Sequence, residues 1–174
     1  MKKLLAIIVL GLLWNSSGFT QDSLQESFKK NNEEENVYNI SYRCSGLYLF
    51  LVKKDYDERL IKLNLKTKEE QNKFDNEFFE NNQNKVYASM FMMVSVGLDK
   101  KKNLYSIEDS AKLVVPQTTK WKSIYTNEAK KNFNNSGNYF SGGFIKKDFL
   151  FCEKAKDLII SDSEFKIEKY LKIK

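Results

Sequence analysis

Apolar side chains recur every three or four residues along most of this chain. In the first such stretch they are Val37, Ile40, Cys44, Leu47 and Leu51. This unbroken spacing places them on one face of a helix. We therefore predict a first helix near residues 34–54, with the glutamates at 33–35 favourably placed at its positive N-terminal end.

A β-hairpin over residues 47–65 competes with the end of this helix. Residues 47–52 are rich in strand-forming side chains, and residues 59–65 can be read with a two-residue period. The single helical period from Val37 to Leu51 favours the helix. We place a connection over residues 55–66 after it.

The next helix is predicted over residues 67–98. Thr67 followed by Glu70 is the signature of a capping box, and an apolar stripe continues beyond it. The stretch contains no proline, and its only glycine is near the end. We expect one long helix with a bend near Asn81 and Asn82.

Two more helices follow, near residues 106–134 and 144–160. Ser106 is a good N-cap for the first of these. Pro116, the only proline in the chain, lies inside it and predicts a kink or a break into two pieces. The four helices together predict an all-α, four-helix bundle-like single domain over residues 34–174. A flexible lead-in over residues 21–33 precedes it.

The first 20 residues have the order of a secretory signal peptide. Two lysines precede an apolar run over residues 4–14, and polar and small residues follow it. The apolar run is shorter than the ~20 residues that span a bilayer. We therefore predict a periplasmic or secreted protein with no stable membrane span after cleavage.

Charge and residue usage exclude several classes of function. Loss of two lysines with residues 1–20 lowers the net charge from +6 to +4, and Arg43 and Arg59 are the only arginines. Short lysine runs without clustered arginine argue against nucleic acid as a partner. The chain has no histidine, which excludes the usual zinc sites and histidine-dependent nucleophiles. We assign no catalytic residue, metal or cofactor.

The two cysteines, Cys44 and Cys152, predict a disulfide between the first and last helices. An exported chain meets an oxidising compartment, and two cysteines allow one intramolecular pairing. Closing a loop of this length stabilises a fold by ~4–5 kcal/mol in the chain-entropy model.

Asp148 interrupts an apolar stripe one turn before Cys152. A buried carboxylate needs a partner, and Arg43, next to Cys44, would be the nearest cation. We predict a largely buried Arg43–Asp148 salt bridge that fixes the register of the two helices. The alternative is that Asp148 caps its own helix or faces water.

Two short motifs are familiar. They are the segment Tyr42-Arg43-Cys44-Ser45-Gly46-Leu47 and the Asp-x-x-x-Cys pattern of residues 148–152. In these motifs the chain resembles small uncharacterised exported proteins of AT-rich marine alphaproteobacteria, of the Pelagibacter type. The resemblance implies a helical periplasmic domain closed by one disulfide, and it implies no activity.

Three functional hypotheses follow. The leading one is a non-catalytic periplasmic binding or envelope-associated structural module, with an envelope protein or a small ligand as its partner. The second is a carboxylate-dependent enzyme resembling cell-wall glycan hydrolases. Its candidate acids are Glu69, Glu70, Asp75, Glu77 and Glu80, although the same residues are typical of a solvated helix face. The third is a eukaryotic secreted protein glycosylated at Asn39 or Asn134.

Overall fold

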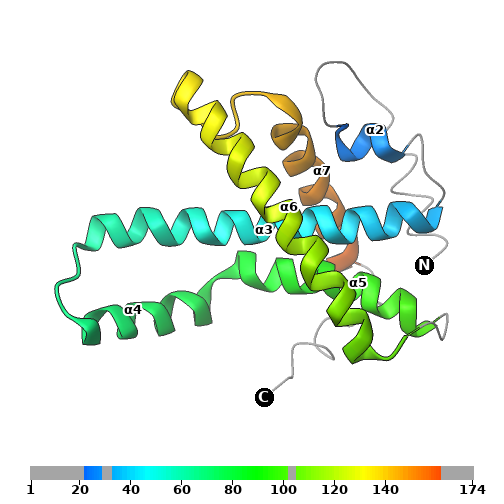
Figure 1. Ribbon diagram of the computed structural model, residues 1–174, viewed down its shortest axis with the longest axis horizontal. Coiled ribbons are helices and arrows are strands. Elements are labelled where there is room, and N and C mark those ends of the chain that lie inside the picture. Colours follow the sequence, from blue (N-terminus) through cyan, green and yellow to red (C-terminus); the bar gives the residue numbers. More distant parts are fainter. Residues whose placement is uncertain (1–21, 29–32, 102–104, 162–174) are drawn as a thin grey trace.

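The computed structural model describes residues 22–28, 33–101 and 105–161, and every regular element in these ranges is a helix (Figure 1). The helices are α2 (Leu24–Phe28), α3 (Glu33–Leu63), α4 (Lys68–Asn81), α5 (Gln83–Lys101), α6 (Ile107–Ser136) and α7 (Gly143–Ser161). A disulfide between Cys44 and Cys152 joins α3 to α7. The predicted all-α fold with one disulfide is therefore confirmed. The predicted signal peptide lies outside the described residues.

Helix α3 is the axis of the fold. In Figure 1, α5 runs alongside its N-terminal half, and α6 crosses it obliquely. Helix α7 also packs on this half, and the short α2 lies against both α3 and α7. We call this packed part the body. Its core is formed by buried residues of the helices, including Leu47, Phe91, Tyr125 and Ile145.

The crossing of α3 and α6 depends on Gly46. A Cβ atom at this position would lie 2.6 Å from the Cβ of Trp121 and 2.9 Å from the backbone nitrogen of Lys122. Glycine weakens a helix interior by ~0.5–1 kcal/mol relative to alanine. Here it allows the two helix backbones to touch. The neighbouring Ser45 hydroxyl lies 2.8 Å from that of Thr118 and forms a buried hydrogen bond across the same crossing.

Beyond the body, the end of α3 and the whole of α4 form a projecting helical hairpin (Figure 1). We call residues 53–81 the arm. Its two helices are held together by aromatic rings: the Tyr56 ring centroid lies 5.5 Å from that of Phe74 and 5.3 Å from that of Phe78. The Tyr56 hydroxyl also donates to Asp75 at 2.8 Å. The capping box predicted at Thr67 begins α4.

The predicted connection over residues 55–66 is wrong, because α3 continues to Leu63. Ion pairs spaced four residues apart support the extra turns: Lys53–Asp57, Lys54–Glu58 and Arg59–Asp55. The alternative hairpin over residues 47–65 is likewise excluded. The predicted single helix over residues 67–98 is divided at Asn82, which has an extended backbone conformation, so the expected bend is a break.

Two further expectations need correction. Helix α6 runs through Pro116, so of the predicted kink or break into two pieces, the break is wrong. Pro116 is exposed, and the carbonyl that loses its N–H partner can bond to water. The prediction of a flexible lead-in over residues 21–33 is wrong at Leu24–Phe28, because these residues form α2 and the Leu24 side chain is fully buried. Residues 29–32 lie outside the described ranges.

Candidate functional site

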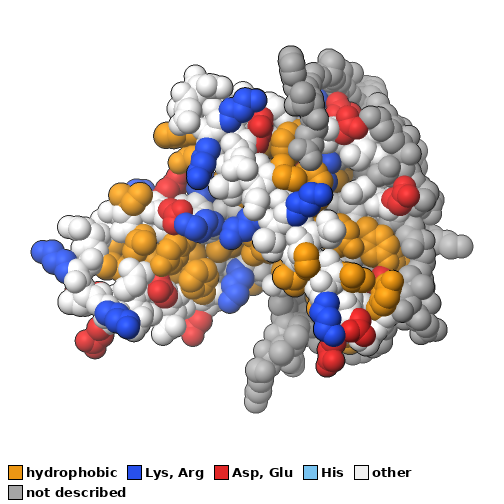
Figure 2. Space-filling model, viewed as in Figure 1, with side chains coloured by type: hydrophobic (Ala, Val, Ile, Leu, Met, Phe, Trp, Pro, Cys, Tyr) orange, Lys and Arg blue, Asp and Glu red, His pale blue; other side chains and the backbone are white. Residues whose placement is uncertain are grey.

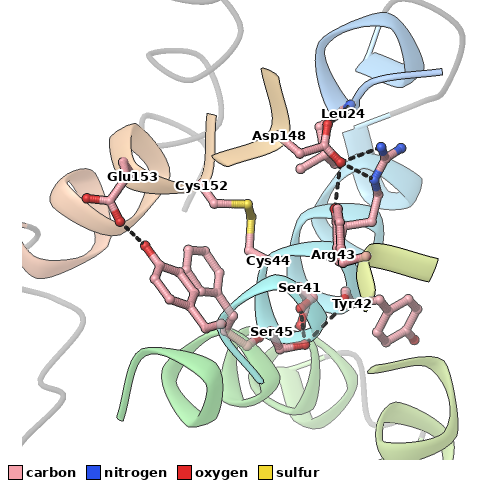
Figure 3. Close-up of a disulfide and its surroundings, with 12 residues drawn as sticks. Leu24, Ser41, Tyr42, Arg43, Cys44, Ser45, Asp148, Cys152 and Glu153 are labelled. Carbon is pink, nitrogen blue, oxygen red and sulfur yellow. Dashed lines mark hydrogen bonds and ion pairs between the residues drawn. A yellow bond between two sulfur atoms is a disulfide. The ribbon is translucent and has the colours of Figure 1, made fainter. Parts of the chain in front are cut away.

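The residues predicted from the sequence meet where α2, α3, α6 and α7 converge (Figure 3). Cys44 and Cys152 form a buried disulfide with 5.4 Å between their Cα atoms. One residue away, Arg43 Nε donates to Asp148 Oδ2 at 3.0 Å, and Nη2 donates to the same oxygen. The side chains are 3% and 0% exposed. Asp148 therefore does not face water.

Two further donors, which the sequence analysis did not predict, complete the shell of the Asp148 carboxylate. The Leu24 backbone N–H donates to Oδ1 at 2.8 Å, and the Tyr125 hydroxyl donates to Oδ2 at 2.5 Å. The Arg43 guanidinium also contacts an aromatic ring, because its carbon lies 4.2 Å from the centroid of the Trp121 ring. This position suits a cation–π contact.

The electrostatics of the pair favour charged partners. Burial alone would lower the pKa of Arg43, but the Asp148 carboxylate raises it, and the guanidinium keeps its charge. Burial raises the pKa of Asp148, while Arg43 and the Tyr125 hydroxyl oppose that rise. Because every group that reaches the two oxygens donates a hydrogen, the site fits the ionised carboxylate. Burial and Asp148 also raise the pKa of Tyr125 well above its ordinary value, so its hydroxyl stays protonated.

The segment 42–47 is therefore a structural motif in most of its positions. Arg43 and Cys44 bond to α7, whereas Ser45 and Gly46 contact α6. These four residues are buried, so none can touch a substrate. Tyr42 is different: in Figure 3 its ring points away from the ion pair and the disulfide.

Tyr42 belongs to a hollow between the start of α3 and the start of α6. The hollow has a volume of about 450 Å³ and is lined by Glu35, Tyr38, Asn39, Tyr42, Tyr105 and Leu113. The Tyr38 and Tyr42 rings stack with 5.9 Å between their centroids. On the opposite wall Tyr105 and Leu113 are half exposed, at 50% and 49%. The hollow is thus an aromatic surface open to solvent.

The surroundings of this hollow are acidic. Within the described part of the chain, Glu35 is the one charged residue in its lining. Behind the wall, the Tyr38 hydroxyl donates to Asp99, which is 3% exposed. Burial and the charge of Asp99 raise the pKa of Tyr42, which therefore stays neutral at ordinary pH. Carboxylates together with the negative faces of aromatic rings favour a positively charged ligand.

The candidate acids of the second hypothesis lie elsewhere. Glu69, Glu70, Glu77 and Glu80 are exposed on α4, and Asp75 accepts hydrogen bonds from Tyr56 and Gln71. Glu70 belongs to the capping box, where backbone N–H groups of residues 66 and 67 lower its pKa. Among the described residues, no group of three or more histidine, cysteine, aspartate or glutamate side chains could hold a metal ion.

The sequence did not indicate the hollow, because its residues come from helices about 70 positions apart, and tyrosines at helical spacing are typical of a core. Comparison with protein-family models, curated proteins and solved structures finds no match to this chain. Within the described residues, no helix has the length and apolar character needed to cross a membrane.

Proposed function

We propose that this protein is an exported, non-catalytic binding module that holds a small organic cation in the tyrosine-lined hollow. The observation that carries the proposal is the composition of the wall. Among the residues that the structure describes, three tyrosines, one glutamate and no lysine or arginine line it. Aromatic faces attract cations within about 6 Å of the ring centroid, most strongly ammonium groups from which water is removed.

Export is the first part of the proposal. The signal-peptide pattern of residues 1–20 supports it, and so does the disulfide, because such bonds persist mainly in oxidising compartments. Cell fractionation of the tagged chain tests this part. We expect a shortened protein in the periplasm or medium. Full-length protein confined to the cytoplasm would contradict export.

The small number of carboxylates that can reach a ligand in the hollow favours binding over glycan hydrolysis. Glycoside hydrolysis ordinarily uses two carboxyl groups that flank the scissile bond. Glu35 is the one carboxylate among the described lining residues, and Asp148 is enclosed by its donors inside the body. Asp99 is also enclosed behind the wall and bonded to Tyr38. Ligand capture on the tyrosine faces needs no second acid.

The experiment is a titration with tetramethylammonium and choline, followed by NMR shifts of the tyrosine rings. We expect saturable shifts that are confined to the hollow. Tyr42→Leu keeps an apolar side chain without the ring face, and Glu35→Gln removes the charge. Each should weaken binding about tenfold, which corresponds to ~1.4 kcal/mol.

The matched control is Tyr139→Leu. Tyr139 is a half-buried tyrosine that stacks on Phe133, with a centroid distance of 4.6 Å, and does not line the hollow. This variant should bind like the parent. Tighter binding of neutral sugars than of ammonium compounds would contradict the proposed ligand class. Absence of any saturable binding would contradict the binding function itself.

A further inference from the structure

The end of the arm has a charge pattern unlike the rest of it. We call residues 59–68 the tip; they comprise the last turn of α3, the turn after it and the first residue of α4. The tip contains four cations, Arg59, Lys62, Lys66 and Lys68, and no acidic residue. Elsewhere in the arm, acids and lysines are interspersed. Arg59 pairs with Asp55 outside the tip, whereas no ion pair within the described residues involves the three lysines.

The remaining tip side chains are mainly aliphatic, and the fold leaves two of them in water. Leu60, Ile61, Leu63 and Leu65 alternate with the cations. Ile61 is 80% exposed and Leu63 is 51% exposed. Figure 2 shows hydrophobic side chains in a band over the arm, with basic side chains, and acidic ones beside them, near its outer end. The hairpin carries these groups away from the body, so a large flat surface can approach them without touching α6 or α7 (Figure 1).

We infer that the tip docks on an anionic lipid surface. Ile61 and Leu63 enter the interfacial layer, and Lys62, Lys66 and Lys68 contact lipid phosphates. Shallow insertion of aliphatic side chains together with electrostatic attraction is the usual physics of peripheral membrane binding. The long lysine stems can lie along the apolar layer while their charges remain at the phosphates. This inference is independent of the hollow and of its proposed ligand.

The shape of the tip favours lipid over an acidic protein surface. A narrow convex hairpin end needs a matching groove in a protein partner, whereas a lipid interface adapts to it. The exposed apolar residues of the tip are aliphatic, and aliphatic side chains gain by leaving water without a shaped pocket. The basic side chains of the tip also complement the negative charge of the lipid surface, because each basic residue near an anionic membrane adds to the attraction.

The test is flotation of the full chain, as recovered from the expressing cell, with two kinds of vesicle. One contains phosphatidylglycerol and phosphatidylcholine, and the other contains phosphatidylcholine alone. We expect binding to the anionic vesicles that weakens with added salt. Ile61→Ser with Leu63→Ser should weaken it about tenfold or more. Lys62→Gln with Lys66→Gln and Lys68→Gln should remove the preference for anionic vesicles.

The control replaces two equally exposed aliphatic residues of the body. Val115 on α6 and Leu150 on α7 are 53% and 54% exposed, so Val115→Ser with Leu150→Ser matches the tip change in chemistry. This variant should bind like the parent, and any binding through residues 1–21 is common to all variants. Equal binding by the parent and the Ile61/Leu63 variant would overturn the inference. So would absence of a preference for anionic vesicles, or attachment to neither kind of vesicle.

Discussion

The two halves of α3 belong to one helix but are stabilised in different ways. The N-terminal half has a disulfide at Cys44, a buried ion pair at Arg43 and a close helix crossing at Gly46. The C-terminal half contacts α4 through the Tyr56 ring, and near its end the Ile61 side chain is exposed to solvent. A helix that is regular from end to end can thus contain a rigid half and a weakly supported half.

The polar contacts of the two halves differ in the same way. In the body, the Tyr48 hydroxyl donates to Glu153 and the Ser41 hydroxyl bonds to Ser95 at 2.9 Å, both across helices. In the arm, most ion pairs join residues one turn apart on the surface, and such pairs contribute only ~0–1 kcal/mol each. We therefore expect the body to unfold as one cooperative unit and the arm to open locally first.

Loss of the disulfide should have the largest effect on this difference. Cys44→Ala with Cys152→Ala removes a covalent loop with a sequence separation of 108 residues. The loop-entropy model predicts a loss of ~4–5 kcal/mol in the free energy of unfolding. Urea unfolding of the variant and the oxidised parent measures it. A change below ~1 kcal/mol would show that noncovalent contacts alone hold α3 to α7.

The buried ion pair should follow closely. Arg43→Met or Asp148→Leu leaves one charge buried without its partner, and each should lower the free energy of unfolding by ~3–5 kcal/mol. The double variant should lose much less than the sum, because no charge is then left unpaired. A double-mutant cycle by chemical denaturation measures the coupling. Small, additive losses would be inconsistent with a pair that fixes helix register.

Gly46→Ala should have an intermediate effect. The new Cβ would meet the Trp121 side chain and the α6 backbone, so the crossing must open, at a cost of ~1–3 kcal/mol. Gly97→Ala is the matched control, because a Cβ there has nothing within 4 Å and adds helix propensity. The control should be neutral or more stable by up to ~1 kcal/mol. Equal melting temperatures for the two variants would disprove a tight crossing.

Phe78→Ala should have the smallest effect on global unfolding. Phe78 is the buried aromatic residue of α4, and its loss weakens the packing on Tyr56. The free energy of arm opening should fall by ~3 kcal/mol. Hydrogen exchange should accelerate over residues 68–81 and remain slow around residues 41–50. Acceleration in both segments would mean that arm and body are a single cooperative unit.

Local sequence signals predicted the helices well where one periodic face or one cap decided the structure. The capping box at Thr67 and the apolar period from Val37 to Leu51 are both found in the structure. The prediction failed at residues 55–63, where ion pairs between Lys53, Asp57 and their neighbours extend a helix whose apolar stripe fades. Those pairs were readable as a four-residue charge pattern, which is the signal that could have located the end of α3.

Contacts between distant segments were harder to predict. The disulfide followed from a count of two cysteines, but burial of α2 depends on the reach of Asp148 to the Leu24 N–H. No local pattern encodes that bond. The hollow depends in the same way on how α6 crosses α3, which brings Leu113 to Tyr38 and Tyr42. Helix propensity and periodicity contain no information about that crossing.

The long-range bonds of the body also set the timing of folding. Leu24, Arg43 and Cys44 bond to partners that lie 124, 105 and 108 residues further along the chain. These bonds of α2 and α3 can therefore form only after α7 has been synthesised, and earlier native structure is limited to local helical turns. Until α7 has been synthesised the body cannot complete its long-range contacts, and the chain stays largely unfolded. Under the export proposed above, this topology would delay folding until the chain has crossed the membrane and reached the compartment where Cys44 and Cys152 can join.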